Sequence, residues 1–307
     1  MSLLQIKKTF AEGKLNKWEY IDKMFDKHSL LFEYPALLQQ TDIDKIELND
    51  EGVVMTFRSS GVKMFCSSND KRLAPFDALN FGSYEQEELQ MQVNLMDDDF
   101  TIFDVGGNYG WYAIHIASRF PKAKIFSFEP IPDTYHQLVK NIALNHISNI
   151  NSFDFGFSDK PGSFSFFYDP ALSANASMKN VSGSNTIKEV TCKVNTIDDY
   201  NREQRLTIDF IKCDVEGAEL MVFKGAEKTI AENLPIIFSE MLRKWTAKFN
   251  YHPNDIIAFL SQFGYQCFTL DHGKLHTFGV VDESTLETNY FFLHPEKHAE
   301  KIKRFTA

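Results

Sequence analysis

Residues 101–129 constrain the fold more than any other part of the chain. An apolar run at 101–103 leads into the glycine-rich sequence Asp104-Val105-Gly106-Gly107-Asn108-Tyr109-Gly110. An amphipathic stretch at 111–119 follows, and a second apolar run at 124–128 ends at Glu129. This order predicts a strand, a tight turn, a helix and a strand, with an acidic side chain placed to accept from ribose hydroxyls. The segment is typical of a nucleoside-binding unit.

The spacing of the turn favours one nucleoside over another. A dinucleotide fingerprint reads G-x-G-x-x-G and brings a pyrophosphate onto a helix N-terminus, whereas this turn reads D-x-G-x-x-x-G. The carboxylate of Asp104 would repel a phosphate, but it would attract the amino group of a methionine moiety and a nearby sulfonium. We therefore expect S-adenosylmethionine as the cofactor rather than NAD. The alternative at this point is a tight turn that binds no ligand.

Chain length and the change in sequence pattern near residue 95 predict one large domain with a smaller N-terminal region. The 307 residues are 43% apolar, which is enough for a large core. Residues 1–95 predict a helical segment and a small β-meander, either a lid or an oligomerisation region. Residues 96–296 predict the nucleoside-binding domain. Residues 297–307 predict a short, solvated basic tail.

Charge and cysteine usage exclude several classes of protein. The net charge of -10 argues against a nonspecific nucleic-acid binder, which would need a basic face. The four cysteines show no C-x-x-C pairing, so zinc or redox chemistry is not expected. No signal-peptide hydrophobic region and no apolar run of about 18 residues is found. We expect a cytoplasmic protein with reduced cysteines and no integral membrane segment.

Strand-like and helix-like runs alternate after residue 100, which favours an α/β fold. We expect a Rossmann-like, seven-stranded, mostly parallel sheet with helices on both faces. The expected strands are 101–103, 124–128, 151–157, 207–213 and 235–239, a final antiparallel pair at 265–270 and 289–293, and further extended segments at 163–168 and 189–194. The expected helices in this part are 111–119, 132–145, 218–231 and 253–263. Residues 169–188 lack periodicity and predict either a functional lid or a plain surface loop.

Carboxylates follow several of the expected strands. In a doubly wound sheet, ligands bind beyond the carboxyl ends of the strands. An acidic group there could orient a hydroxyl substrate, accept its proton, or hold a metal ion. The alternative for two of these residues is capping of the helix expected from residue 218. The carboxylates are Asp104, Glu129, Asp214 with Glu216, and Glu240, and the capping alternative concerns Asp214 and Glu216.

Several motifs together resemble the FkbM family of S-adenosylmethionine-dependent methyltransferases over roughly residues 80–295. The resemblance is carried by the glycine turn at 103–110 and by Phe128-Glu129-Pro130, Phe157-Ser158-Asp159 with Gly162, Val194-Asn195-Thr196-Ile197-Asp198-Asp199, Asp214-Val215-Glu216-Gly217-Ala218-Glu219 and Lys224-Gly225-Ala226. It implies a class I methyltransferase fold and methyl transfer to a hydroxyl oxygen. It also implies donor contacts at Asp104, Gly106, Asn108, Gly110, Glu129, Asp154 and Ser158. The sequence departs from the family pattern at Gly107 and Asp154.

Catalysis is expected to depend on carboxylates near the transferred methyl group. Asp214 is the first choice for the base, followed by Glu216 and Glu240, while His115 fits better as a packed, hydrogen-bonded residue. The same three carboxylates could hold magnesium, but the spacing does not demand it, so we expect a metal-independent enzyme.

The sequence predicts the chemical class of the acceptor, and three other functions compete with methyl transfer. The expected acceptors are a sugar or glycan hydroxyl, a secondary-metabolite hydroxyl, or a small phenol, and a homo-oligomer is allowed. An NAD-linked nucleotide-sugar enzyme would need a third fingerprint glycine and a Tyr-x-x-x-Lys pattern. A nucleic-acid methyltransferase would need a Pro-Pro-aromatic strand end and a basic groove. A catalytically silent S-adenosylmethionine-binding protein is a third alternative.

Overall fold

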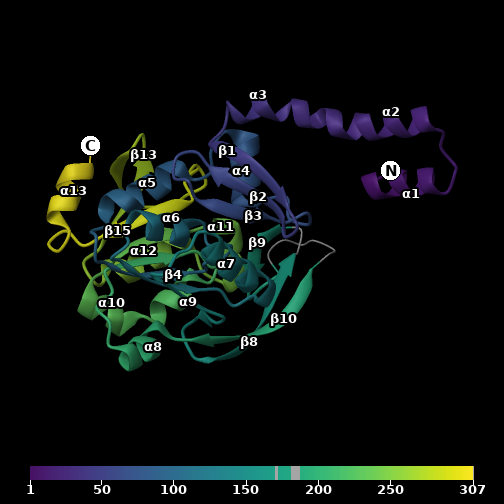
Figure 1. Cartoon of the computed structure of the whole chain (residues 1–307). Helices are drawn as coiled ribbons and strands as arrows, with labels where there is room; N and C mark the ends of the chain where they lie inside the picture. Colours follow the sequence, from purple (N-terminus) through teal and green to yellow (C-terminus); the bar gives the residue numbers. More distant parts are fainter. Residues whose placement is uncertain (170–171, 181–186, 307) are drawn as a thin grey trace.

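A computed structural model describes residues 1–169, 172–180 and 187–306. Figure 1 shows a rounded body and an arm that extends away from it. The arm is helical and consists of α1 (Leu3–Ala11), α2 (Lys17–His28), the 3-10 turn η1 (Ser29–Phe32) and α3 (Tyr34–Leu38). Among the described residues, no helix combines the length and apolar character needed to cross a bilayer.

The body is built on a central sheet whose described strands run in the order β14-β13-β15-β12-β11-β4-β5-β6. The five strands from β6 to β12 are parallel, β15 is antiparallel to β12, and β13 is antiparallel to β15. The strands are β4 (Thr101–Val105), β5 (Lys124–Phe128), β6 (Ile150–Phe153), β11 (Phe210–Cys213), β12 (Ile236–Glu240), β13 (Gln266–Asp271), β14 (Lys274–Phe278) and β15 (Asn289–Leu293). The expected seven strands are therefore present, and the edge strand β14 makes an eighth within the described chain.

Both faces of this sheet are buried, as expected for parallel strands covered by helices. On β4, Ile102 packs into one apolar cluster, while Phe103 and Val105 pack into another on the opposite face. The first cluster includes residues of α6 (Trp111–Arg119). The second includes residues of α8 (Ile197–Gln204), α9 (Glu219–Lys224), α10 (Glu227–Asn233) and α12 (Pro253–Ser261). The result is a three-layer α/β body.

A second sheet contains β7 (Gly156–Phe157), β8 (Gly162–Asp169), β9 (Leu172–Ser177) and β10 (Lys188–Asn195), in the order β7-β10-β8-β9. The single strand expected at 151–157 is wrong. The chain leaves the central sheet after β6, and β7 pairs instead with Val194 and Asn195 of β10. Part of the expected loop 169–188 is strand β9, while 170–171 and 181–186 lie outside the described residues.

The helix expected at 218–231 is interrupted between α9 and α10. A Cβ atom on Gly225 would lie 2.1 Å from the carbonyl oxygen of Ser158. The backbone after β7 therefore passes so close to this position that only glycine fits. The break between the two helices lies at this crossing.

The N-terminal meander is present and shares the core of the body. It contains β1 (Ile43–Asn49), β2 (Gly52–Phe57) and β3 (Lys63–Cys66), followed by α4 (Ala74–Phe81) and α5 (Gln86–Leu95). Met55 and Met64 belong to the same apolar cluster as α6. Side chains of α7 (Pro132–Leu144) and of the residue after it hold β3 in place. The Asn141 Oδ1 atom accepts from the Phe65 N–H at 2.9 Å, and the Asn145 Oδ1 atom accepts from the Lys63 N–H at 2.8 Å.

The C-terminal residues form helix α13 (Ala299–Phe305). None of its residues is fully buried, but the helix is not wholly solvated, because the partly buried Ile302 and Phe305 pack against the core. The Lys301 ammonium also pairs with the Asp97 carboxylate at 2.9 Å. Two further short helices, α11 (Arg243–Thr246) and the 3-10 helix η2 (Ala247–Phe249), follow β12.

Candidate active site

The glycine-rich turn is held between two neighbouring strands. The N–H groups of Gly106 and Gly107 both donate to the Phe128 carbonyl at 3.0 Å. Gly106 has φ +80°, and a Cβ atom there would lie 1.9 Å from the carbonyl oxygen of Asp214. Only glycine combines this backbone conformation with so close an approach. The turn therefore brings the end of β4 directly against the segment that follows β11.

Asp104 lies beneath this turn rather than on its surface. The side chain is buried, its Oδ2 atom accepts from the Ser127 hydroxyl at 2.7 Å, and its Oδ1 atom lies 3.6 Å from the Lys212 ammonium. These contacts give Asp104 a role in holding the turn and the lysine. Direct contact between Asp104 and a methionine amino group stays a prediction.

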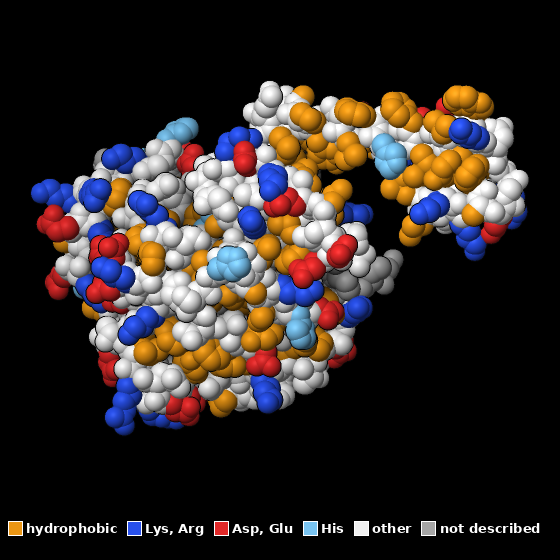
Figure 2. Space-filling model, in the orientation of Figure 1, with side chains coloured by type: hydrophobic (Ala, Val, Ile, Leu, Met, Phe, Trp, Pro, Cys, Tyr) orange, Lys and Arg blue, Asp and Glu red, His pale blue; other side chains and the backbone are white. Residues whose placement is uncertain are grey.

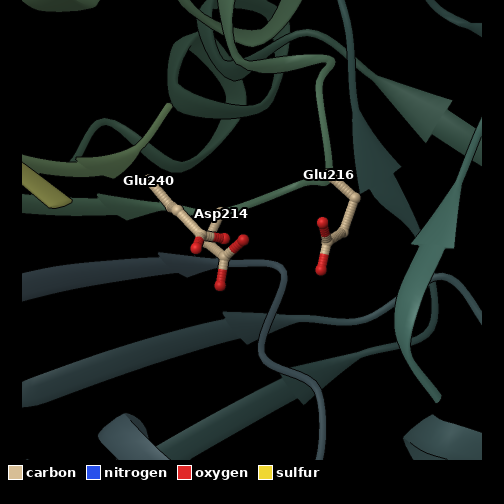
Figure 3. Close-up of side chains that lie close together, drawn as sticks. All are labelled: Asp214, Glu216 and Glu240. Carbon is tan, nitrogen blue, oxygen red and sulfur yellow. The ribbon is translucent and has the colours of Figure 1, made fainter. Parts of the chain in front are cut away.

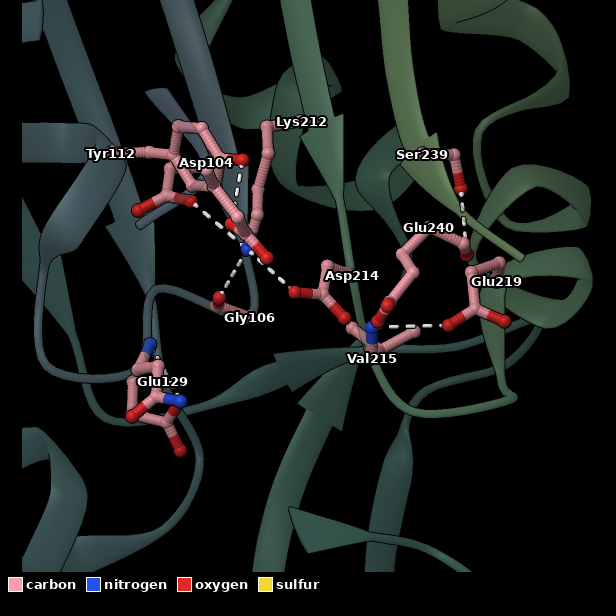
Figure 4. Close-up of polar contacts among 12 residues, drawn as sticks. Asp104, Gly106, Tyr112, Glu129, Lys212, Asp214, Val215, Glu219, Ser239 and Glu240 are labelled. Carbon is pink, nitrogen blue, oxygen red and sulfur yellow. Dashed lines mark hydrogen bonds and ion pairs between the residues drawn. The ribbon is translucent and has the colours of Figure 1, made fainter. Parts of the chain in front are cut away.

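Lys212 is a charged residue of the site that sequence analysis did not select. It is 4% exposed in the middle of β11, donates to the Gly106 carbonyl at 2.6 Å and lies 3.5 Å from the Asp214 carboxylate (Figure 4). Burial disfavours its charged form, but attraction to Asp214 and Asp104 outweighs burial and raises the lysine pKa. A lysine within a strand of apolar residues, Phe210-Ile211-Lys212-Cys213, was the available signal.

Glu129 is held in place by two backbone donors. Its carboxylate accepts from the Asn108 N–H at 3.0 Å and from the Ile131 N–H at 2.9 Å. Burial raises the pKa of Glu129 to about 7, although both hydrogen bonds and the Lys212 charge act in the opposite direction. The side chain is thus fixed at the end of β5, where sequence analysis expected a ribose contact.

A cavity brings together five of the residues selected from sequence. Its lining contains Gly106, Asn108, Glu129, Asp214 and Glu216, with Pro130, Ile131, Phe166, Ala176 and Val215. Phe166 and Ala176 come from β8 and β9, so the second sheet forms one wall. The buried atoms Asn108 Oδ1 and Glu216 Oε2 have no hydrogen-bond partner among the described residues. Such unpaired polar atoms in a cavity fit a polar ligand.

The other four expected donor contacts, Asp104 described above and Gly110, Asp154 and Ser158, do not line this cavity. Gly110 is the N-cap of α6, with φ +90°. Asp154 is exposed between β6 and β7. Ser158 is buried, and its N–H donates to the Asn195 carbonyl at 2.9 Å. Their contact with the cofactor stays a prediction.

Three carboxylates converge at the ends of β11 and β12. Asp214, Glu216 and Glu240 each place an oxygen within 4.8 Å of the other two, and Figure 3 shows Asp214 beside Glu240 with Glu216 facing them. Burial and the Asp214 charge raise the pKa of Glu216 and of Glu240 well above the ordinary value. Burial and repulsion from Asp214 therefore favour the protonated form of Glu240.

Glu216 also has an unusual backbone conformation. Its φ is +56°, in the left-handed region, and its carbonyl accepts from the buried Ser177 hydroxyl at 2.7 Å. Strained conformations of non-glycine residues cluster at functional sites. This backbone directs the Glu216 side chain into the cavity.

Helix capping does not explain Asp214 or Glu216. The N-cap of α9 is Ala218, without a side-chain cap. The Glu219 carboxylate instead accepts from the N–H groups of Val215 and Gly217 at 3.1 and 3.0 Å. Glu219 therefore orders the loop after β11, and the side chains of Asp214 and Glu216 are left for other contacts.

A second cavity lies on the other side of Asp214. It is lined by Met64, Arg72, Leu73, Ala74, Tyr84, Glu85, Gly107, Asn108, Tyr109, Trp111, Tyr112, Lys212 and Asp214. Glu85 accepts from the Tyr112 hydroxyl at 2.7 Å, and burial raises its pKa to about 7. Sequence analysis did not select Glu85. The N-cap of α5 is Glu85, with φ +42°.

His115 is a packed residue, as expected. Its Nδ1 atom lies 2.8 Å from the Trp111 carbonyl, and its ring centroid lies 3.9 Å from that of Trp111. Burial lowers its pKa to about 4. It lines neither of the two cavities beside Asp214.

The fold and the site define a class of protein. A parallel sheet with an antiparallel β15 next to β12, a glycine turn after β4 and an acidic residue after β5 form the Rossmann-like fold of class I methyltransferases. The Methyltransferase FkbM domain family model matches residues 104–267. The chain belongs to the FkbM methyltransferase family.

Several relatives carry methyltransferase names. Methyltransferase sdnD of Sordaria araneosa is 31% identical, covering 50% of this chain and 68% of its own. Hexuronic acid methyltransferase AglP of Haloferax volcanii is 32% identical over 46% of this chain and 56% of its own. The 2-O-methyltransferase NoeI of Sinorhizobium fredii is 28% identical over 44% and 60%. The chain thus spans between about half and two thirds of these relatives.

A solved structure gives a more distant likeness. The FkbM methyltransferase of Methylobacillus flagellatus KT has 16% sequence identity and a TM-score of 0.43, and it covers 71% of this chain and 53% of its own.

Proposed function

We propose that the chain transfers a methyl group from S-adenosylmethionine to a hydroxyl oxygen. The observation that carries the proposal is the single cavity in which Glu129 and the glycine turn lie opposite Asp214 and Glu216. Glu129 would hold the ribose and the turn would accommodate the methionine part. The bound donor would supply a methyl group made electrophilic by its sulfonium.

Alignment of the two reactants would be the main contribution of the protein. Positioning can contribute about 7–11 kcal/mol by avoiding the loss of translational and rotational freedom. The buried network of Lys212, Asp104 and Gly106 supports this, because it fixes the turn against the end of β11. Ser177 fixes the Glu216 backbone in the same way from β9.

Asp214 is the proposed base for the acceptor hydroxyl. Burial favours the protonated forms of Glu216 and Glu240, whereas Asp214 is less buried and lies 3.5 Å from the Lys212 ammonium. A carboxylate that lines both cavities can accept a proton from a hydroxyl group placed between them.

We further propose that the reaction needs no metal ion. Within the described residues, the candidate cation ligands are Asp214, Glu216 and Glu240. The Lys212 ammonium, 3.5 Å from Asp214, already places one positive charge beside these groups.

The proposed acceptor is a sugar or glycan hydroxyl, followed by a secondary-metabolite hydroxyl. The relatives named for hexuronic acid methylation and 2-O-methylation support the first choice. The second cavity, with Arg72, Tyr84 and Tyr112 in its wall, offers polar and aromatic contacts of the kind sugars use. A cytoplasmic location is also proposed, supported by the four free cysteines.

Calorimetric titration with the donor, its demethylated product and NAD tests the cofactor class. We expect saturable binding of the first two and none of NAD. A panel of uronic acids and neutral sugars is then assayed with labelled donor, with and without EDTA. Binding of NAD alone would contradict the proposal in favour of a nucleotide-sugar enzyme, and donor binding without turnover on any acceptor class would favour a silent protein.

Donor affinity is expected to depend on the charge of Glu129. With a pKa of about 7, the ionised fraction of Glu129 falls from roughly nine tenths at pH 8 to roughly one tenth at pH 6. If the donor binds only to the protein with ionised Glu129, the apparent affinity falls about tenfold over this range. The raised pKa also means that the apo protein loses stability as the pH rises from about 4.5 through 7.

Glu129→Gln provides the comparison. We expect weaker donor binding with a smaller pH dependence than in the wild type, measured by titration at pH 6, 7 and 8. The donor's own amino group titrates in the same way with both proteins, so its contribution cancels when the two pH profiles are compared. An unchanged pH slope in the variant would assign the effect to another group, such as Glu85.

A further inference from the structure

The helical arm exposes an unusual amount of apolar surface. In the described chain, most of the large exposed apolar side chains lie within residues 1–38, and Figure 2 shows hydrophobic atoms gathered along the arm. They are Met1, Leu3, Leu4, Phe10, Trp18, Ile21, Phe25, Leu30, Leu31, Phe32, Tyr34 and Leu37. Helix α1 has a single buried residue, Ile6, while α2 and α3 have none. The arm has little core of its own.

The apolar residues of α2 follow the spacing of a helix-pairing stripe. Trp18, Ile21 and Phe25 are separated by three and four positions, and they are 72%, 40% and 60% exposed. This spacing places them on one face, like the a and d positions of a coiled coil. Within the arm, α1 contacts α2 through a ring stack between Phe10 and Tyr20, which is not part of the stripe. The stripe itself is left uncovered.

The size of the exposed surface matches a dimer interface. Aromatic side chains can bury about 150–250 Å² each, so the exposed parts of Trp18, Phe25 and Phe32 amount to roughly 400 Å². The aliphatic members bring the total to roughly 1,000 Å², more than the ~300–600 Å² patch of a typical monomer. Each partner of a standard interface buries about 800 Å². The arm alone therefore provides enough surface.

The charges of the arm favour a protein partner over a membrane. Residues 1–34 contain the basic residues Lys7, Lys8, Lys14, Lys17, Lys23 and Lys27 and the acidic residues Glu12, Glu19, Asp22, Asp26 and Glu33. Helices that bind anionic lipid surfaces carry an excess of basic residues on the polar face. An almost neutral mixture of both signs instead allows an antiparallel identical helix to match its charges.

We propose that this arm binds the arm of a second copy of this chain. The two α1–α2 hairpins would pack about a twofold axis into a four-helix bundle, with Trp18, Ile21 and Phe25 of each copy at the centre. Isolated helices shorter than about 12–15 residues are marginally stable in water. The contact would therefore also stabilise the arm, and it is independent of the proposed reaction.

Sedimentation velocity of the full chain across a micromolar concentration series tests the proposal. We expect a dimer for the wild type and a monomer for the double variant Trp18→Glu/Phe25→Glu. The matched control is Leu286→Glu, which removes an apolar side chain that is 90% exposed outside the arm; it should stay dimeric. Circular dichroism and thermal melting of the body confirm that the double variant is folded.

Two results would overturn the proposal. One is a wild-type protein that sediments as a monomer throughout the series. If such a monomer also floats with vesicles of phosphatidylcholine and phosphatidylglycerol, the partner of the arm is a lipid surface. The other is a double variant that stays dimeric, because the interface would then lie elsewhere.

Discussion

Asp214→Asn is expected to lower kcat by about 10²–10⁴-fold while donor affinity changes little. Asparagine keeps the shape of the side chain, but it cannot take a proton from the acceptor hydroxyl. The Lys212 ammonium keeps Asp104 as a partner, so the fold should be preserved. Single-turnover methyl transfer and donor titration separate the two effects.

Glu240→Gln and Glu216→Gln are the matched controls for Asp214→Asn. Because burial favours protonated Glu240 and Glu216, a neutral amide of similar shape replaces a neutral acid. We expect each control to lose less than about tenfold in kcat, the scale of one altered hydrogen bond. If a glutamine variant lost turnover and Asp214→Asn kept it, the base would be assigned to that glutamate. If Asp214→Asn lost donor affinity equally, Asp214 would belong to the donor pocket.

Lys212→Met is expected to lower the free energy of unfolding by about 3–5 kcal/mol, because it leaves a buried charge without its partner. The Asp104 carboxylate is 3% exposed and would keep only the Ser127 hydroxyl, while the Gly106 carbonyl would lose its donor. Urea unfolding at pH 7 measures the change. The glycine turn should loosen as well, with a loss of donor affinity.

Two comparisons make the Lys212 prediction specific. Lys193→Met changes an exposed lysine on β10 and should alter stability by no more than about 0.5 kcal/mol. The double variant Lys212→Met/Asp104→Asn should recover part of the loss, since the unpaired charge is removed. A single variant as stable as the Lys193 control would mean that the buried lysine contributes nothing to the fold.

Part of the proposed donor site could be predicted from the sequence because its signals are local. Glycine spacing, two apolar runs and the acidic residue after β5 lie within 101–129, and the structure joins Gly106, Asn108 and Glu129 in one cavity. The carboxylates after β11 and β12 were also placed correctly, since the ends of parallel strands meet at one edge of a sheet. The final antiparallel pair, β13 and β15, is confirmed.

Nonlocal contacts account for what was missed. Glu85 reaches the site only because α5 packs beside α6, where Tyr112 donates to it. A single strand was expected at 151–157 because apolar and polar residues alternate through the segment 154–155, where the chain changes sheets. For β14 the signal was present, since His272 and Gly273 both have positive φ in a two-residue hairpin and the sequence His-Gly suggests such a turn.

Helix α7 makes contacts beside both cavities. It starts directly after Pro130 and Ile131, which line the first cavity, and it extends about 20 Å at 1.5 Å per residue. At its far end Asn141 donates to the Tyr109 carbonyl and accepts from the N–H of Phe65, the neighbour of Met64 in the second cavity wall. One rigid helix therefore fixes the distance between the wall of the first cavity and strand β3 beside the second.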